Sequence, residues 1–340
     1  MKKEILKIEN AIGTVLAHDV TKIVPGEFKG PAFKRGHIIK RKDLETLRNM
    51  GKNHVTILTL EEDELHEDES AIRLAKSVIG KGIKISRPSE GKVDMIAEYK
   101  GILKVNTQLL FKTNSNEKIV LATLHNNTVV EKETRVAGTR IIPLAIKERE
   151  IFEVEEHVEK DEIISIEKMY PLKTGILVTG TEVFTGRITD KFGSVLKKKI
   201  IDYGAEFVDI AYAPDDTRVI EKEILSLISK GAEVILVSGG MSVDADDVTP
   251  TAISGISSEV VSYGSPVLPG AMFMLAYIGS IAILGIPGCA MYHKSTALDL
   301  IYPRVLAKEK ITRDDIIQLA HGGLCLGCDQ CTYPVCPFGK

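Results

Sequence analysis

The chain has 340 residues, of which 44% are hydrophobic and 27% are charged, and its formal net charge is −3. This balance is typical of a folded protein of two or three domains, and it excludes a global basic field for nucleic acid. Residues 260–292 carry no charge, but prolines and glycines divide them into pieces much shorter than the ~20 residues of a membrane-spanning helix. The first ten residues lack an apolar core of signal-peptide length. We therefore expect a cytoplasmic protein without membrane or nucleic-acid partners.

Residues 1–150 predict an accessory region of mixed α+β, largely β-rich structure. The predicted elements are, in order, a strand at 13–17, a loop at 25–31, a helix that ends at Gly51, a strand at 54–58, an acidic linker at 61–69, a helix at 72–79 and mainly β structure at 83–147. The region shows no compact set of catalytic side chains. A charge-dense segment at 147–162 follows, and we expect a linker at 151–170, with a helix as the alternative for the charged part.

Residues 171–310 alternate predicted strands with predicted helices. Apolar, β-branched runs such as 234–237 predict buried strands, and apolar residues at helical spacing, as in 220–228, predict helices between them. With right-handed crossovers, this alternation predicts an α/β fold on a doubly wound, mainly parallel sheet. Ligands of such sheets bind beyond the carboxyl ends of the strands, so the loops there are the candidate site.

The stretch 238–250 carries the strongest local signal in the chain. Gly239 and Gly240 follow a predicted buried strand and let the backbone bend sharply and approach a ligand closely. Three acids come next, and a helix is predicted to begin at Thr249. Free amides can bind phosphate oxygens at such a turn, and one or two carboxylates can hold Mg²⁺. A solvated acidic turn is the alternative. The three acids are Asp244, Asp246 and Asp247.

A second loop with glycines and acids spans 179–193. Asp190 lies where the next helix is predicted to begin, and a helix dipole favours a carboxylate there. Helix capping is therefore the alternative to a ligand-binding role for Asp190. Two proline–glycine turns, at 269–270 and 287–288, complete the set, and each could instead simply end a strand.

Together these motifs resemble the molybdopterin-binding domain that molybdenum insertases share with molybdopterin adenylyltransferases. Their order and spacing match along 171–310, and residues 1–150 more loosely resemble the accessory part of an insertase. The matching pieces are 179–182, 188–190, 238–243, 247–250, 269–270 and 286–288.

The resemblance implies a molybdopterin ligand, phosphorylated or adenylylated, with molybdate as a candidate second substrate. Asp190 and Asp247 match the two functional acids of the family, which implies catalytic residues that hold Mg²⁺ against phosphate. It also implies a homo-oligomer, a dimer or a trimer. The residues implied to bind the cofactor are Thr179, Gly180, Glu182, Ser238, Gly239, Gly240, Ser242, Asp246, Pro269, Gly270, Pro287 and Gly288.

Three positions depart from the insertase pattern. Asp244 and Ala245 stand where insertases place glycine and aspartate. Ala271 replaces a frequent lysine, and Cys289 replaces an asparagine. We expect a helix to open at 291–294, where His293 and Lys294 are candidates to supply the missing cation.

Three functions fit these residues. The favoured one is a Mg²⁺-dependent molybdopterin molybdotransferase of the insertase type, because a bare adenylyltransferase would not need the accessory half. The second is an enzyme of the same domain family that cleaves or transfers a nucleotide pyrophosphate, either a pyrophosphatase or an adenylyltransferase. The acidic runs at 214–216 and 246–249 also resemble the pyrophosphatase branch of that family. The third is a non-catalytic molybdopterin carrier or redox sensor.

Residues 311–340 form a cysteine-rich tail. Four of the five cysteines follow the spacing Cys-x₂-Cys-x₂-Cys-x₄-Cys-Pro. A reducing cytoplasm disfavours disulfides, whereas four thiolates at short spacing can enclose one metal centre. The run is close to the ferredoxin iron–sulfur pattern, with one extra residue before the last cysteine. Zinc sites usually separate two Cys-x₂-Cys pairs by a longer loop, so we expect an iron–sulfur cluster ahead of zinc. The four cysteines are Cys325, Cys328, Cys331 and Cys336.

Overall fold

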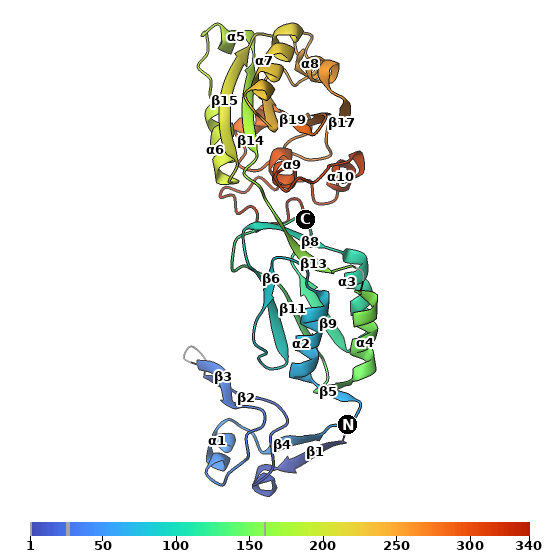
Figure 1. The fold of residues 1–340 in the computed structure, drawn as a ribbon. Coiled ribbons are helices and arrows are strands. Elements are labelled where there is room, and N and C mark those ends of the chain that lie inside the picture. Colours follow the sequence, from blue (N-terminus) through green and yellow to red (C-terminus); the bar gives the residue numbers. More distant parts are fainter. Residues whose placement is uncertain (1, 25–27, 160) are drawn as a thin grey trace. The chain divides into compact units, whose positions relative to one another are not determined.

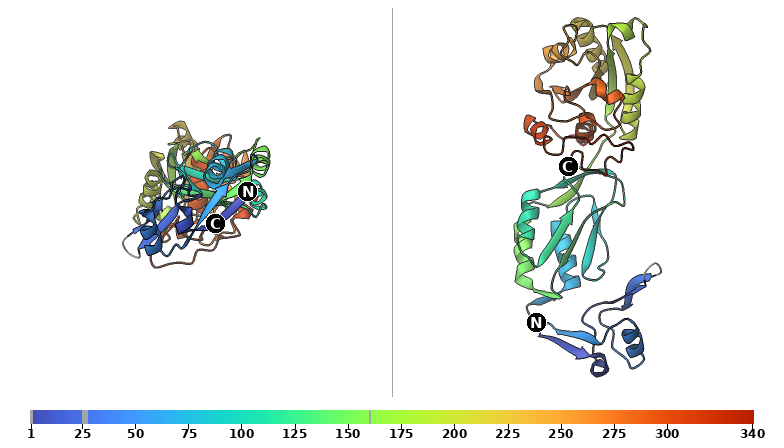
Figure 2. Two further views of the ribbon diagram at one scale, coloured as in Figure 1. Left: turned by 90° about the horizontal axis from the view of Figure 1, so that it is seen from below. Right: turned by 180° about the vertical axis from the view of Figure 1, so that it is seen from behind.

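The structure is a computed structural model that describes residues 2–24, 28–159 and 161–340. It divides into two compact units, drawn in Figures 1 and 2. Unit 1 holds residues up to 166 except 100–102 and 127–129, and unit 2 holds those two short segments and residues 167–340. The loop predicted at 25–31 lies partly outside the described residues.

The first part of unit 1 is a set of short strands around a small core. β1 (Lys2–Lys7) pairs with β4 (His54–Thr59), and β2 (Val20–Val24) pairs with β3 (Phe28–Phe33), both antiparallel. A 3₁₀ turn η1 (Ile8–Ala11) and the helix α1 (Asp43–Asn49) complete it. The predicted helix before Gly51 and the strand at 54–58 are thus confirmed. The strand predicted at 13–17 is wrong, because this segment makes only the isolated bridge between Val15 and Ile38.

Residues 64–168 form a four-stranded, a three-stranded and a two-stranded sheet, with helices packed against the four-stranded one. The strands are β5 (Glu64–His66), β6 (Ile83–Ile85), β7 (Lys92–Ala97), β8 (Gly101–Val105), β9 (Ile119–Thr123), β10 (Val129–Val130), β11 (Arg135–Ile141), β12 (Ala145–Lys147) and β13 (Ile164–Lys168), and the helices are α2 (Glu67–Val78), α3 (Thr107–Asn114) and α4 (Glu148–His157). The main sheet has the order β6-β7-β11-β9. Buried residues of α2 and α4 share one core with it.

Two segments expected to be linkers are folded. Residues 61–69 contain β5 and the start of α2, where the ring of His66 accepts a hydrogen bond from the amide of Asp68. The acids that suggested a linker occupy the first turn of α2, where the helix dipole favours negative charge. The expected linker at 151–170 holds most of α4 and all of β13, and Ile151 and Val154 are buried in the core of unit 1.

Unit 2 contains one six-stranded sheet with the order β15-β14-β16-β19-β18-β17. The first four strands in that order are mutually parallel, whereas β18 is antiparallel to both of its neighbours. The strands are β14 (Lys173–Thr179), β15 (Glu206–Ala213), β16 (Val234–Ser238), β17 (Glu259–Tyr263), β18 (Met274–Ile278) and β19 (Ile281–Ile286). The mainly parallel sheet confirms the predicted α/β class.

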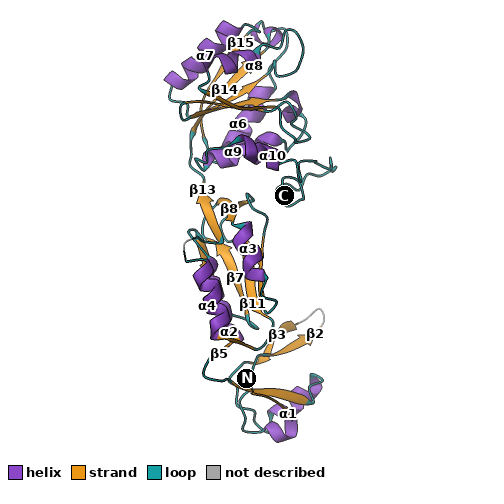
Figure 3. Cartoon of the chain, turned by 90° about the vertical axis from the view of Figure 1, so that its right-hand side faces the viewer, coloured by secondary structure: helices purple, strands orange, loops and turns teal. Residues whose placement is uncertain are grey.

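Helices cover both faces of this sheet (Figure 3). On β14, Ile176 and Val178 belong to the core formed with α6 (Phe192–Asp202) and α9 (Ala297–Leu306), and Leu177 belongs to the core formed with α7 (Thr217–Ser229) and α8 (Thr249–Ile256). The sheet is therefore doubly wound, and burial on both faces explains its uninterrupted apolar strands. Unit 2 also holds α5 (Thr181–Phe184), η2 (Gly288–Met291) and α10 (Arg313–Gln318). No described helix is long and apolar enough to cross a membrane.

The cysteine-rich tail is packed onto unit 2. Phe338 is 2% exposed and lies in the same core as α6 and α9. The amide of Leu268 donates to the carbonyl of Gly323, and the amide of Cys325 donates to the carbonyl of Leu268, each at 2.8 Å. Because burying a phenylalanine contributes about 1.5–3 kcal/mol, the tail is a stable part of the unit.

Candidate functional site

The carboxyl ends of β14, β16 and β19 lie at one edge of the sheet. The three strands are parallel, and their register pairs Val178 with Ser238 and Ser238 with Ile286. The loops that follow them therefore begin side by side, as a doubly wound sheet requires of a ligand site. We call residues 179–193 and 238–248 the strand-end loops.

Two glycines allow close packing at the start of the second strand-end loop. Gly239 has φ +95°, and a Cβ built on it would lie 2.1 Å from the carbonyl oxygen of Thr179. Gly240 has φ +52°, and its Cβ would lie 2.7 Å from the hydroxyl of Thr249. The Thr179 hydroxyl also donates to the carbonyl of Ser238 at 3.2 Å. Only glycine permits this geometry, so the sharp bend predicted at 239–240 is confirmed, and the close approach to a ligand stays a prediction.

The side chain of Ser238, at the end of β16, is a fully buried polar group without a hydrogen bond among the described residues. An unsatisfied buried hydroxyl costs about 1–3 kcal/mol. Such a group in a native protein points to an ordered water or a bound ligand that completes it.

The loop after β16 is closed by Asp247. One oxygen of its carboxylate accepts a hydrogen bond from the amide of Ser242 at 2.9 Å. From β17, the hydroxyl of Tyr263 donates to the carbonyl oxygens of Met241 and Ser242 at 3.2 and 3.1 Å. Burial, and then the charge of Asp247, raise the pKa of Tyr263, so the phenol stays a donor. Asp244 and Asp246 are exposed. Tyr263 had no signal in the sequence, because its contact arises only from the fold.

Asp190 lies two residues before α6, and its carboxylate caps the first turn of that helix. Its carboxylate accepts hydrogen bonds from the amides of Phe192 at 2.7 Å and Gly193 at 3.1 Å, and from the hydroxyl of Tyr212 at 3.1 Å. These contacts support the capping interpretation. Among the described residues, neither Asp190 nor Asp247 belongs to a group of three possible metal ligands within 4.8 Å of one another. Mg²⁺ commonly uses only one or two carboxylates beside substrate phosphates, so either acid alone could hold it.

Asp215, which follows β15, anchors the first strand-end loop. One of its carboxylate oxygens accepts from the amide and the hydroxyl of Thr181 at 2.9 and 3.0 Å. Its neighbour Asp216 caps α7 by accepting from the amides of Arg218 and Val219. The sequence at 214–216 favours the start of a helix over a site, beside its likeness to nucleotide pyrophosphatases, so the contact of Asp215 with Thr181 was missed.

Acids outnumber bases around the strand-end loops. A phosphate group that binds there meets a negative field, which a divalent cation would neutralise. Glu182 folds back over Gly180, whose Cβ would lie 3.0 Å from the carboxylate. The acids are Glu182, Asp190, Asp215, Asp216, Asp244, Asp246 and Asp247, and the bases are Arg187, Lys191 and Arg218.

The two proline–glycine turns have different surroundings. The carbonyl of Pro269 accepts from the amide of Ala297 at 3.3 Å, and a Cβ on Gly270 would lie 2.7 Å from the Cβ of Ala297. This turn therefore packs against the start of α9. Pro287 and Gly288 follow β19 directly and begin η2. The helix expected at 291–294 is wrong, because α9 begins at Ala297, and His293 and Lys294 lie in an exposed connecting segment.

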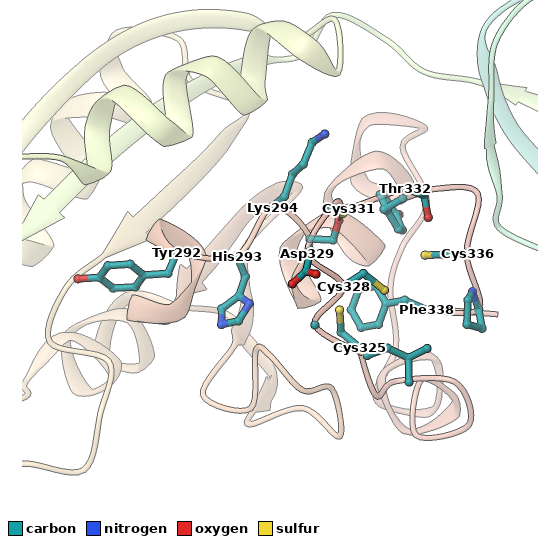
Figure 4. A pocket seen from close by; sticks show the side chains of 15 residues that line it. Tyr292, His293, Lys294, Cys325, Cys328, Asp329, Cys331, Thr332, Cys336 and Phe338 are labelled. Carbon is teal, nitrogen blue, oxygen red and sulfur yellow. Dashed lines mark hydrogen bonds between the residues drawn. The ribbon is translucent and has the colours of Figure 1, made fainter.

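The four tail cysteines share one cavity of about 340 Å³, shown in Figure 4. We call it the cysteine cavity. His293, Lys294 and Ser295 form part of its wall, together with tail residues such as Asp329 and Phe338. The Ser295 hydroxyl lies 3.5 Å from Sγ of Cys331 and lowers the pKa of that thiol. Cys289 does not line the cavity, and burial raises the pKa of its thiol.

One group of possible metal ligands lies outside both sites. His66, Glu67 and Asp68, at the start of α2, have ligand atoms within 4.8 Å of one another. Both ring nitrogens of His66 are engaged, since Nε2 bonds the carbonyl of Ala17 at 2.6 Å and Nδ1 accepts from the amide of Asp68 at 3.3 Å. Burial lowers the pKa of His66, so its ring is neutral and acts as a structural link.

Comparison with known proteins supports the domain found in unit 2. Residues 175–307 match the family model described as a "Probable molybdopterin binding domain", and residues 5–59 match a domain of unknown function (DUF8806). A CinA-like protein of Mycobacterium sp. (strain JLS) is 35% identical over 82 residues, which are 24% of this chain and 20% of that protein. A CinA-like protein of Mycolicibacterium vanbaalenii is 38% identical over 82 residues, 24% of this chain and 19% of that protein. The chain thus spans about a fifth of the length of these relatives.

Solved structures of similar proteins each match about two fifths of the chain. The molybdopterin biosynthesis enzyme MoaB from Thermus thermophilus is 21% identical, with a TM-score of 0.35, over 39% of this chain and 91% of that one. The tungsten cofactor synthesizing protein MoaB from Pyrococcus furiosus is 19% identical, with a TM-score of 0.34, over 39% of this chain and 92% of that one. On the family match and its motifs, residues 175–307 of this chain form a domain of the molybdopterin-binding family.

Proposed function

We propose that this chain binds a molybdopterin-type ligand at the strand-end loops and acts in the assembly of molybdenum cofactor. The observation that carries the proposal is the contact of Gly239 with the backbone of Thr179, beside the unpartnered hydroxyl of Ser238. This arrangement puts a bent backbone and a buried polar group at the edge where ligands of doubly wound sheets bind. The match of residues 175–307 supports a role related to cofactor biosynthesis.

The chemistry that we propose depends on Mg²⁺. When bound, the ion would neutralise the charge of the ligand's phosphates during phosphoryl or nucleotidyl transfer. Asp247 is the best candidate to hold it, because only one of its oxygens bonds Ser242. The carboxylate of Asp190 already caps α6, so Asp190 would have to bind Mg²⁺ while it keeps those hydrogen bonds. Transfer of molybdate to the pterin, as in an insertase, is our first assignment. The homo-oligomer that the resemblance implies stays a prediction.

Removing the charge of a site acid should weaken Mg²⁺-dependent binding and leave folding intact. We expect Asp247→Asn to weaken binding of adenylylated molybdopterin by about tenfold or more in the presence of Mg²⁺, which corresponds to about 1.4 kcal/mol. The free energy of unfolding should change by less than about 0.5 kcal/mol, because asparagine keeps the shape of the side chain. Titrations with and without Mg²⁺, and urea unfolding, measure the two effects.

Asp216→Asn is the matched control for the molybdopterin assignment, because Asp216 lies at the same edge of the sheet and its carboxylate caps α7. Asparagine is also a good cap, so Asp190→Asn should fold normally. If Asp190→Asn binds like the Asp216→Asn control, Asp190 is a cap and no more. If no form of molybdopterin binds to the folded wild-type protein, the proposal fails.

A second candidate is cleavage of a nucleotide pyrophosphate. The acid run at 246–249 and the position of Asp215 beside Thr181 favour it. Incubation of the protein with adenylylated molybdopterin and Mg²⁺ separates the candidates. Release of AMP that requires molybdate indicates a transferase, release without molybdate indicates a pyrophosphatase, and saturable binding without release indicates a carrier.

A further inference from the structure

The cysteine-rich tail is a closed loop rather than a loose end. The amide of Gly339 donates to the carbonyl of Gly322 at 2.9 Å, which joins the two ends of the loop. Phe338 is buried in the core of unit 2, and the hydroxyl of Tyr333 donates to the carbonyl of Asp299 at 3.0 Å. These anchors hold the segment between them in a defined shape, and that segment carries all four cysteines of the run.

The four thiols turn toward one space. Cys325, Cys328, Cys331 and Cys336 all line the cysteine cavity, and no disulfide joins any of them. Figure 4 shows the four labelled cysteines gathered on the tail, with His293 and Lys294 on the neighbouring segment. Thiolates are the ligands that soft metals and iron–sulfur clusters select. Four of them around one cavity therefore form a candidate metal site independent of the strand-end loops.

The spacing of the sulfurs favours a cluster over a single zinc ion. Zinc–sulfur bonds of about 2.3 Å place the sulfurs of a tetrahedral site about 3.8 Å apart. No three of the tail sulfurs, all of which are described, lie within 4.8 Å of one another. A cavity of about 340 Å³ among more widely spaced thiols has room for a polynuclear centre. The proline after the last cysteine is a further feature of ferredoxin runs.

We propose that Cys325, Cys328, Cys331 and Cys336 ligate an iron–sulfur cluster in the cysteine cavity. Such clusters are anionic, and the Lys294 side chain on the cavity wall supplies a positive charge. The Ser295 hydroxyl, 3.5 Å from Sγ of Cys331, is placed to donate a hydrogen bond to a ligating sulfur. Hydrogen bonds and charges of this kind tune the reduction potential of a cluster.

The cluster site does not depend on the proposed function. Within unit 2, the end of the chain lies at the opposite end of β14 from α5, which begins the first strand-end loop (Figures 1 and 2). The metal content of the protein can therefore be measured without any molybdopterin. A failure to bind molybdopterin leaves this inference untouched, and a protein without iron leaves the proposed function untouched.

Anaerobic purification, followed by reconstitution with ferrous iron and sulfide, tests the proposal. The full chain should be brown and contain iron and acid-labile sulfide in equal amounts. Cys328→Ser should lower both by at least about tenfold, because it removes one of four ligands. Cys328 is exposed, so this variant should keep the circular dichroism spectrum and unfolding midpoint of the wild type.

Cys289→Ser is the matched control, since Cys289 is half-buried outside the cavity, and this variant should keep full iron. Equal loss of iron from both variants would overturn the assignment. A colourless wild-type protein, either metal-free or with one zinc per chain, would do so too. Cys336→Ser tests the four-residue spacing before the last cysteine, and full retention of iron would overturn Cys336 as the fourth ligand.

Discussion

Gly239→Ala is expected to destabilise unit 2 by about 2–5 kcal/mol and to abolish ligand binding. The backbone of Gly239 has φ +95°, a conformation that costs a residue with a side chain about 1–2 kcal/mol. The added Cβ would lie 2.1 Å from the carbonyl oxygen of Thr179, and overpacking of that kind adds about 1–3 kcal/mol. The contacted atom belongs to the backbone of β14, so a side-chain rotation cannot relieve the clash. Urea unfolding measures the change in the free energy of unfolding.

Gly186→Ala separates the two costs. Gly186 has φ +73° in the first strand-end loop, but no atom lies within 4 Å of its added Cβ. The free energy of unfolding of this control should fall only by the cost of the left-handed backbone conformation, about 1–2 kcal/mol. Equal losses in the two variants would mean that the strand-end loops move apart easily. The close approach of Gly239 would then not define the site.

The sheet of unit 2 could be predicted because its strands are buried on both faces. Burial on both sides demands an uninterrupted apolar run, and such a run is visible in the sequence without knowledge of any partner. β18 was missed as a separate strand because it lies in a long charge-free stretch in which every segment is apolar. The helix start at 67–69 was also missed, because acids in a first turn resemble a solvated linker.

The glycine turn of the site could be predicted for a similar reason, since the need for glycine at 239–240 is local to the chain. The groups that hold the loops in place could not. Asp215 reaches Thr181 across 34 positions, and Tyr263 reaches Ser242 across 21. Such contacts depend on which strands are neighbours. For the tail, the spacing predicted a metal ligand set, but its docking through Phe338 needed the fold.

Asp299→Ala is expected to cost about 3–5 kcal/mol of stability, because it removes one partner of a buried ion pair. The carboxylate of Asp299 is 3% exposed and lies 2.5 Å from the ammonium of Lys199, which is itself 12% exposed. It also accepts hydrogen bonds from the amide of Thr296 at 2.8 Å and from the hydroxyl of Tyr203 at 3.0 Å. Burial, and then the charge of Asp299, raise the pKa of Tyr203, so the phenol remains a donor. Loss of the carboxylate leaves a buried cation without its partner, which accounts for most of the cost.

Asp202→Ala is the control, because Asp202 pairs with Lys198 at 3.1 Å on the exposed side of α6, the helix that carries Lys199. An exposed pair contributes little, and we expect a change of less than about 1 kcal/mol. The double variant Lys199→Met, Asp299→Ala should recover part of the loss, because it removes the buried cation as well. If the double variant is no more stable than Asp299→Ala, the helix cap, and not the ion pair, is the larger contribution.

Asp299→Ala should also affect the cysteine cavity, because Asp299 stabilises the start of α9. Asp299 holds Thr296 at the start of α9, and Lys199 donates to the carbonyl of Lys294 at 2.8 Å. Lys294 and Ser295 form one wall of the cavity, so loss of these two restraints should loosen it. Reconstituted Asp299→Ala should then lose its iron to a chelator several-fold faster than Asp202→Ala, at a temperature at which both variants are folded. Equal rates would show that the tail holds its metal without support from α9.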